Sequence, residues 1–137
     1  MRRLPLRFTL RQLMAAIALV SLLLGYRAWK ERMQRLSRSY FQQSNLQASQ
    51  ADSAARRARD ERLRGDQYQK MAWAATEVGN EEEAEKLRRL AARSYEKFNE
   101  LNWLSRYHDA LAWKYWRAES RPWLPVEPDP LPPIPSP

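Results

Sequence analysis

The longest apolar stretch of the chain lies close to its N-terminus. Residues 13–26 carry no charge, and as a helix they extend about 21 Å, less than the ~30 Å hydrocarbon core of a bilayer. The wider segment 10–29 reaches the full thickness if Arg11 and Arg27 extend toward the two interfaces. Thr9 and Gln12 have the spacing of a helix-capping box. The pattern predicts a membrane-spanning signal anchor over 9–29, preceded by a basic segment at 1–8.

Two sets of side chains follow from this anchor. The residues predicted to lie in the bilayer or at its edge are Leu13, Ile17, Leu19, Val20, Leu22, Leu23, Leu24, Tyr26 and Trp29. The residues predicted to meet lipid headgroups are Arg2, Arg3, Arg7, Arg11, Arg27, Lys30 and Arg32. Basic residues flank the anchor on both sides, so their count does not set its orientation. A short basic N-terminus favours the orientation with the N-terminus inside and the C-terminus outside.

Three other interpretations of the apolar stretch stay open. A buried helix of a soluble protein can be equally apolar over this length. A cleaved signal peptide also begins with basic residues, although Leu23 and Tyr26 stand where cleavage after Gly25 or Ala28 requires a small side chain. A mitochondrial transit peptide is likewise rich in arginine and poor in acidic residues. The uncleaved anchor is the preferred interpretation.

Beyond the anchor, no helix-breaking residue interrupts 28–64, which predicts a helical stalk over 30–64. Trp29, Met33, Leu36 and Tyr40 follow the 4-3-4 spacing of a coiled-coil seam. We expect this seam to stop where the next positions become Gln43, Gln47 and Gln50. Past them runs a narrow face of small residues, which either packs on another helix or is solvated: Ala51, Ala54, Ala55 and Ala58.

Two glycines predict the helix boundaries further along. Gly65-Asp66 reads as a helix end followed by a new N-cap, and Gly79-Asn80 repeats the device, with Glu83 completing a capping box. The last helix should run to about Glu119, before Pro122. The predicted fold is therefore all-α: the anchor and stalk, a helical hairpin over 66–120 and an extended tail over 121–137. The joint around 79–80 resembles a single tetratricopeptide hairpin, which we take as an architectural hint.

The last helix and the tail carry more aromatic surface than one helix needs. One stripe of this helix consists of Leu101, Leu104, His108, Leu111, Tyr115 and Ala118. Beside or away from it are the residues predicted to bind a protein, together with two from the tail: Trp103, Tyr107, Trp113, Trp116, Trp123 and Pro125. The tail, which holds eight of the nine prolines, is a stiff spacer, a ligand for a proline-recognising partner, or a strap folded over Trp113 and Trp116.

Charge favours lipid over nucleic acid as the partner of the basic residues. The net charge of +8 is confined to residues 1–40, which contain nine Lys/Arg and one Glu. Residues 41–137 contain fifteen of each sign. The excess therefore flanks the apolar helix, where anionic headgroups attract it.

Candidate catalytic chemistry is sparse. His108, the single histidine, lies on an apolar stripe without a metal-binding or catalytic spacing around it, which predicts a packed, hydrogen-bonded side chain. The three isolated glycines do not form a phosphate-binding loop, and the chain has no cysteine. The acidic run 81–85 suits the first turn of a helix. We expect no enzyme activity, no cofactor and no metal.

Two motifs lie at the ends of the chain: RFTLRQLM at 7–14, and YHxxLxxKYxxA at 107–118 followed by PWxP at 122–125. The first resembles the N-termini, and the second a C-terminal module, of small uncharacterised single-pass proteins of planctomycete bacteria. The resemblance implies a bacterial membrane protein and carries no biochemical activity. We therefore expect a membrane-anchored interaction or scaffold module, with an envelope structural protein acting through its basic juxtamembrane region, or a secreted helical protein, as alternatives.

Overall fold

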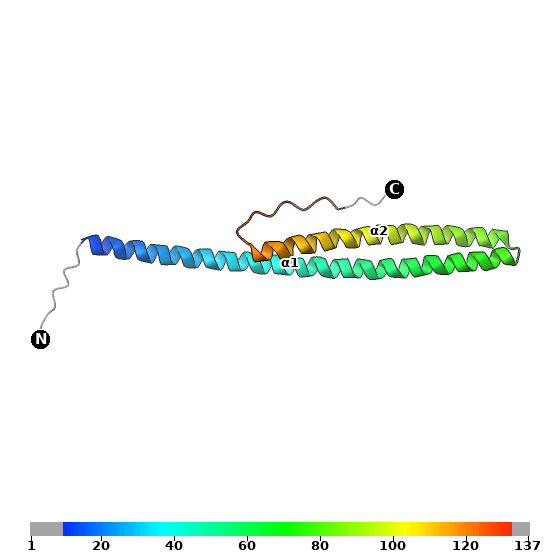
Figure 1. Ribbon diagram of the computed structural model, residues 1–137, viewed down its shortest axis with the longest axis horizontal. Helices are drawn as coiled ribbons and strands as arrows, with labels where there is room; N and C mark the ends of the chain where they lie inside the picture. Colours follow the sequence, from blue (N-terminus) through cyan, green and yellow to red (C-terminus); the bar gives the residue numbers. More distant parts are fainter. Residues whose placement is uncertain (1–9, 133–137) are drawn as a thin grey trace, which may run out of the picture.

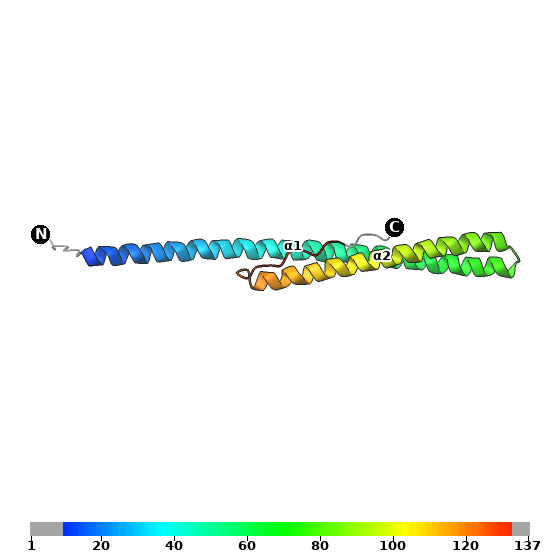
Figure 2. The same cartoon turned by 90° about the horizontal axis from the view of Figure 1, so that it is seen from above.

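The computed structural model describes residues 10–132 and contains two α-helices and no strand over that range. Helix α1 (Leu10–Glu77) and helix α2 (Glu81–Ser120) run side by side in opposite directions and form a long hairpin (Figure 1). The all-α prediction and the hairpin are confirmed. The first part of α1 extends beyond the end of α2 as a single helix (Figure 2). Thr9 of the predicted capping box, and Arg2, Arg3 and Arg7, lie outside the described residues.

The hairpin is held by a heptad seam of mostly small side chains. In α1 the seam positions, all buried or half-buried, alternate in steps of four and three: Tyr40, Ser44, Gln47, Ala51, Ala54, Ala58, Glu61, Gly65, Tyr68, Ala72 and Ala75. In α2 the seam positions are Ala84, Leu87, Ala91, Ser94, Phe98, Leu101, Ser105, His108, Ala112 and Tyr115, and the buried Leu111 lies beside them. Such a repeat is typical of two supercoiled helices. The small-residue face of the stalk is therefore packed. Gln43 and Gln50 are exposed, as expected, but the seam does not end there, because it continues one residue further on through Ser44 and Ala51.

The predicted helix boundary at Gly65-Asp66 is also wrong, since α1 continues through it to Glu77. A Cβ atom at Gly65 would lie 3.0 Å from the ring of Tyr95, so the glycine makes room for this side chain of α2. The Tyr95 hydroxyl donates a hydrogen bond to the Asp66 carboxylate at 2.7 Å and lies 2.9 Å from Gln69 Oε1. The side chains expected to cap a new helix thus contact the opposite helix instead. The predicted stalk and second helix are one continuous arm.

Polar contacts across the seam set the register of the two helices. Ser44 Oγ donates to the carbonyl of Ala112 and Ser105 Oγ donates to the carbonyl of Ala51, each at 3.0 Å. His108 Nδ1 lies 2.6 Å from Gln47 Oε1. His108 is therefore a packed, hydrogen-bonded seam residue, as predicted, and Gln47 belongs to the seam because this histidine satisfies it.

The turn at the far end, or tip, of the hairpin has the predicted chemistry. Gly79 has φ of +80°, a left-handed conformation that glycine adopts without strain. The Asn80 side chain accepts a hydrogen bond from the Glu83 backbone N–H at 3.3 Å and donates one to the Glu83 carboxylate at 2.8 Å. The N-cap at Asn80 is confirmed, but the return bond of a capping box is not formed, because the Asn80 backbone N–H donates to the carbonyl of Ala75 at 2.9 Å. Two ion pairs follow in the first turns of α2, Glu82–Lys86 at 2.7 Å and Glu85–Arg89 at 3.2 Å, both exposed and therefore weak.

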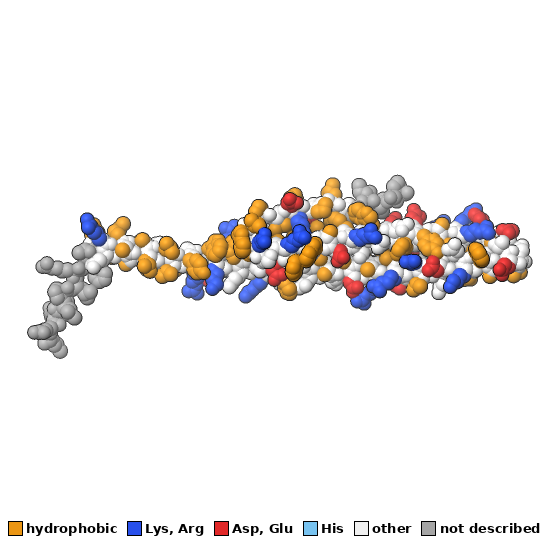
Figure 3. Space-filling model, in the orientation of Figure 1, with side chains coloured by type: hydrophobic (Ala, Val, Ile, Leu, Met, Phe, Trp, Pro, Cys, Tyr) orange, Lys and Arg blue, Asp and Glu red, His pale blue; other side chains and the backbone are white. Residues whose placement is uncertain are grey.

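The start of α1 is, over the described residues, the one stretch of helix long and apolar enough to cross a membrane. This property is shared by membrane anchors and signal sequences. None of its most apolar window is buried in the fold, so the stretch is not covered as a core helix would be. All nine predicted anchor residues, from Leu13 to Trp29, are between 49% and 74% exposed. Figure 3 shows hydrophobic side chains exposed along the part of α1 that extends beyond α2.

Candidate interaction surface at the base of the hairpin

The base of the hairpin is the end where α2 stops beside α1 and the tail turns back. The last turn of α2 closes with the Arg121 backbone N–H donating to the carbonyl of Ala118 at 3.1 Å. Pro122 cannot continue the helix, and the Leu124 N–H then donates to the carbonyl of Arg121 at 3.0 Å. This tight turn reverses the chain, and the tail runs back along α2 (Figure 1).

The tail is held on α2 by one carboxylate and one carbonyl. Asp129 accepts hydrogen bonds from Lys114 Nζ at 2.6 Å and from the Tyr115 hydroxyl at 2.7 Å. The Tyr107 hydroxyl donates to the carbonyl of Pro130 at 2.8 Å. Of the three interpretations of the tail, the structure therefore agrees with a segment folded back on the helix. The prediction that it covers Trp113 and Trp116 is wrong, because the tail lies on the side of α2 that presents Tyr107, Lys114 and Tyr115.

These contacts shift two pKa values in opposite directions. The hydrogen bond from Lys114, and then that from Tyr115, lowers the pKa of Asp129. Burial, and then the hydrogen bond to Asp129, raises the pKa of Tyr115 to about 12. Both shifts favour an ionised carboxylate facing a neutral phenol. Both groups are therefore in the protonation state that stabilises the docked tail at neutral pH.

Two aromatic pairs lie on the outside of α2. Trp113 and Trp116 stack with ring centroids 4.5 Å apart and planes 12° apart, and the Arg117 guanidinium lies 5.0 Å from the Trp113 ring. Trp103 and Tyr107 stack at 6.3 Å and 8°. Residues three or four apart share one side of a helix, which brings each pair together. The side chains of Trp113 and Trp116 remain 52% and 54% exposed, so neither tryptophan is used by the hairpin seam.

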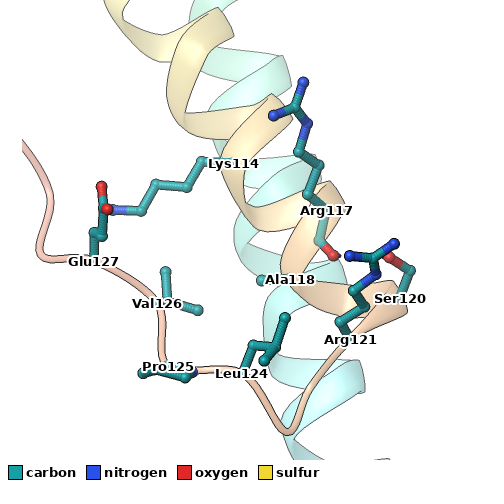
Figure 4. A pocket seen from close by; sticks show the side chains of 9 residues that line it. All are labelled: Lys114, Arg117, Ala118, Ser120, Arg121, Leu124, Pro125, Val126 and Glu127. Carbon is teal, nitrogen blue, oxygen red and sulfur yellow. Dashed lines mark hydrogen bonds between the residues drawn. The ribbon is translucent and has the colours of Figure 1, made fainter.

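An open hollow of about 580 Å³ separates the end of α2 from the returning tail (Figure 4). It is lined on the helix side by Lys114, Arg117 and Ala118, and on the tail side by Leu124, Pro125, Val126 and Glu127, with Ser120 and Arg121 at the turn. Pro125 therefore faces a groove, while Trp123 stands outside it with 60% of its surface exposed.

The six predicted interaction residues do not form one surface. Trp113 and Trp116 form an exposed stacked pair, Trp103 stacks on Tyr107, Pro125 lines the hollow and Trp123 lies alone at the turn. Lys114, Tyr115 and Asp129, which hold the tail, were not among the residues predicted to be functional, and Tyr115 was placed only on the apolar stripe. One signal was available for Asp129: it is an acidic residue between prolines of a segment that cannot form helix or strand.

Over residues 10–132, no cluster of three or more His, Cys, Asp and Glu side chains could hold a metal ion. Comparisons of the chain with protein-family models, with curated proteins and with solved structures find no match. The planctomycete resemblance stays a prediction. The two helices, of 68 and 40 residues, far exceed those of a ~34-residue tetratricopeptide repeat, so the architectural hint from the joint at 79–80 does not extend to them.

Proposed function

We propose that this chain is a membrane-anchored helical hairpin that presents the outer side of α2 to a protein partner and has no catalytic activity. Its anchor is residues 10–29, in the inner membrane of a bacterium, with the N-terminus inside and the hairpin outside. The segment is apolar, uncovered by α2 and flanked by basic residues such as Arg27 and Lys30, which supports this assignment.

The observation that carries the binding role is the stacked Trp113–Trp116 pair with Arg117 over it. Tryptophan and arginine are the residue types most enriched where protein interfaces derive their binding energy. Pre-stacked rings lose little conformational freedom when a partner covers them. Within the hairpin these side chains make no seam contact, so their exposure is unexplained by folding alone.

A photo-crosslinking amino acid at position 116, in the full chain in its native membrane, tests the binding role. We expect one dominant adduct, which disappears when Trp113 and Arg117 are replaced by Ala. The same amino acid at position 73 is the matched control, because Trp73 is also an exposed tryptophan, 72% accessible, but lies near the tip. Equal crosslinking from both positions would contradict a specific surface on α2.

A second candidate is a structural protein of the envelope that acts through its basic juxtamembrane region. The supporting observation is that residues 27–38 hold five Lys/Arg and one Glu, most of them exposed on α1 close to the anchor. Replacing Arg32, Arg35 and Arg38 with Gln should then remove the function while the Trp113–Trp116 variants keep it. The remaining alternative, a secreted form after cleavage, predicts a mature chain that lacks the anchor, which its intact mass would reveal.

A further inference from the structure

We infer that the base of the hairpin is a second membrane contact: the turn 121–124 and the end of α2 rest on the anionic headgroups beside the anchor. The inference rests on the proposed membrane anchor and adds a lipid-binding site in a distant part of the sequence. It assigns Arg121, Trp123 and Leu124 to this site.

The turn 121–124 lies close to the end of the anchor. Pro122 lines a shared hollow with Trp29, Lys30, Met33, Gln34, Ser37 and Arg38 of α1, so the turn lies beside the residues that directly follow the anchor. If residues 10–29 fill the hydrocarbon core, the next four or five residues cross the headgroup layer, which is about 5–7 Å thick on each side. The turn is therefore held at the level of the headgroups by the hairpin itself.

The turn exposes two apolar side chains of the kinds found at membrane interfaces. Trp123 is 60% exposed and Leu124 49%, although both are apolar and next to a folded helix. Tryptophan is enriched at membrane interfaces, where an apolar ring with one N–H group meets both environments. The Tyr26–Trp29 pair, with ring centroids 6.2 Å apart, places the same residue types on α1 at the adjoining end of the anchor.

The base of the hairpin is basic and the tip is not. Residues 27–38 and 114–124, which meet at the base, contain eight Lys/Arg and two Asp/Glu, a net charge of +6. Residues 60–100, around the tip, contain eight Lys/Arg and ten Asp/Glu, a net charge of −2. Arg117 and Arg121 are both exposed and line the open hollow at the base (Figure 4). A surface that is basic and aromatic at one end only is complementary to an anionic bilayer at that end.

Because the chain lacks cysteine, single labels can be placed without other changes. Full-length protein with an environment-sensitive dye on Leu124→Cys is reconstituted in vesicles of phosphatidylcholine with or without phosphatidylglycerol. Nitroxide groups at headgroup depth should quench this dye, more strongly with phosphatidylglycerol. Leu19→Cys, within the anchor, should be quenched by deep nitroxides. Val78→Cys, just past the end of α1 and about 75 Å beyond Trp29, should not be quenched by either.

Arg121→Gln should lower the ratio of docked to undocked turn in anionic vesicles by about fivefold, because one cation near the surface is lost. The matched control is Arg59→Gln, which removes an exposed arginine midway along the hairpin and should leave quenching at position 124 unchanged. An equal loss in both variants would mean that overall charge, and not the base, attracts the lipid, and would overturn the inference.

Two further outcomes separate the inference from the proposal beneath it. If the Leu19 dye is quenched and the Leu124 dye is quenched no more than the Val78 dye, the anchor stands and the second contact is wrong. If the Leu19 dye is not quenched, both fail. A Leu124 dye shielded from aqueous iodide but unaffected by lipid nitroxides would indicate that a second copy of the chain covers the turn, which also overturns the inference.

Discussion

The two ends of the hairpin are built from different residues. Near the tip the helices meet through very small side chains, with Ala72 and Ala84 only 1% and 0% exposed, and the surface is acidic. At the base Tyr40 and Tyr115 stack at 6.3 Å across the seam, the tail adds a third layer, and the surface is basic. Four exposed tryptophans lie there: Trp29, Trp113, Trp116 and Trp123. Near the tip the small side chains of the seam pack the two helices against each other, whereas the base also exposes aromatic and basic side chains that can contact other molecules.

The helices and the tail are held in place by different interactions. Small residues in a seam allow the helix backbones to approach closely, so packing depends on the absence of side-chain volume. At the base, hydrogen bonds such as those of Asp129 attach a segment that has no regular structure. We therefore expect substitutions at the tip to change the unfolding of the whole hairpin and those at the base to change what the surface presents.

The largest expected effect is overpacking near the tip. Ala72→Leu adds three carbons where no space remains and should lower the free energy of unfolding by about 1–3 kcal/mol. The exposed Ala74, two residues away, provides the matched control, since Ala74→Leu should change it by less than about 0.5 kcal/mol. Thermal unfolding followed by circular dichroism would measure both. Equal effects would mean that the seam is not close-packed.

A smaller effect is expected at the turn of the tip. Asn80→Ala removes the side chain that caps α2 and should cost about 1 kcal/mol of unfolding free energy. Asn80→Asp retains the acceptor and should restore most of it. Chemical denaturation of the two variants against the parent chain gives the comparison. A neutral Ala variant would show that the hairpin does not depend on this cap.

The docked tail at the base should respond to pH without unfolding of the helices. The lowered pKa of Asp129 stabilises docking above about pH 4, the unperturbed value, and this contribution is lost as the carboxylate is protonated below it. The raised pKa of Tyr115 stabilises docking below about pH 10, and this contribution is lost as pH rises toward 12. A dye on Leu131→Cys should report release at both extremes.

Asp129→Asn distinguishes this pH response from general unfolding. The amide keeps an acceptor but lacks the charge that Lys114 pairs with, so the variant should release more of its tail at pH 7 and lose the acid transition of the dye. Circular dichroism should show unchanged helix content. An acid transition that persists in the variant would assign the response to another group.

The smallest expected effect on stability is at the Trp113–Trp116 pair. Replacing both with Ala removes exposed rings that make no seam contact, so the free energy of unfolding should change by less than about 1 kcal/mol. The proposed partner crosslink from this surface should nevertheless disappear. A strongly destabilised double variant would mean that the pair supports the fold, and the distinction between base and tip would weaken.

The sequence by itself determined the features that depend on neighbouring residues. The sequence alone predicted the apolar stretch of α1, the Gly79-Asn80 turn, the N-cap at Asn80 and the end of α2 before Pro122, because each is a property of a few consecutive residues. His108 was predicted as a packed side chain on the same basis. Its partner Gln47, 61 residues away, could not be predicted.

Only the tertiary structure decided how far the hairpin extends and where the tail lies. Gly65-Asp66 has the local pattern of a helix boundary, but the Tyr95 ring fills the space above Gly65 and bonds to Asp66, so the helix continues. The alanine face of α1 could have been solvated or packed, and an equally long face on α2 decides between them. Likewise, the sequence of a proline-rich tail does not say which surface it contacts. The fold decides this by bringing side chains of α2 within hydrogen-bonding distance of Asp129 and Pro130.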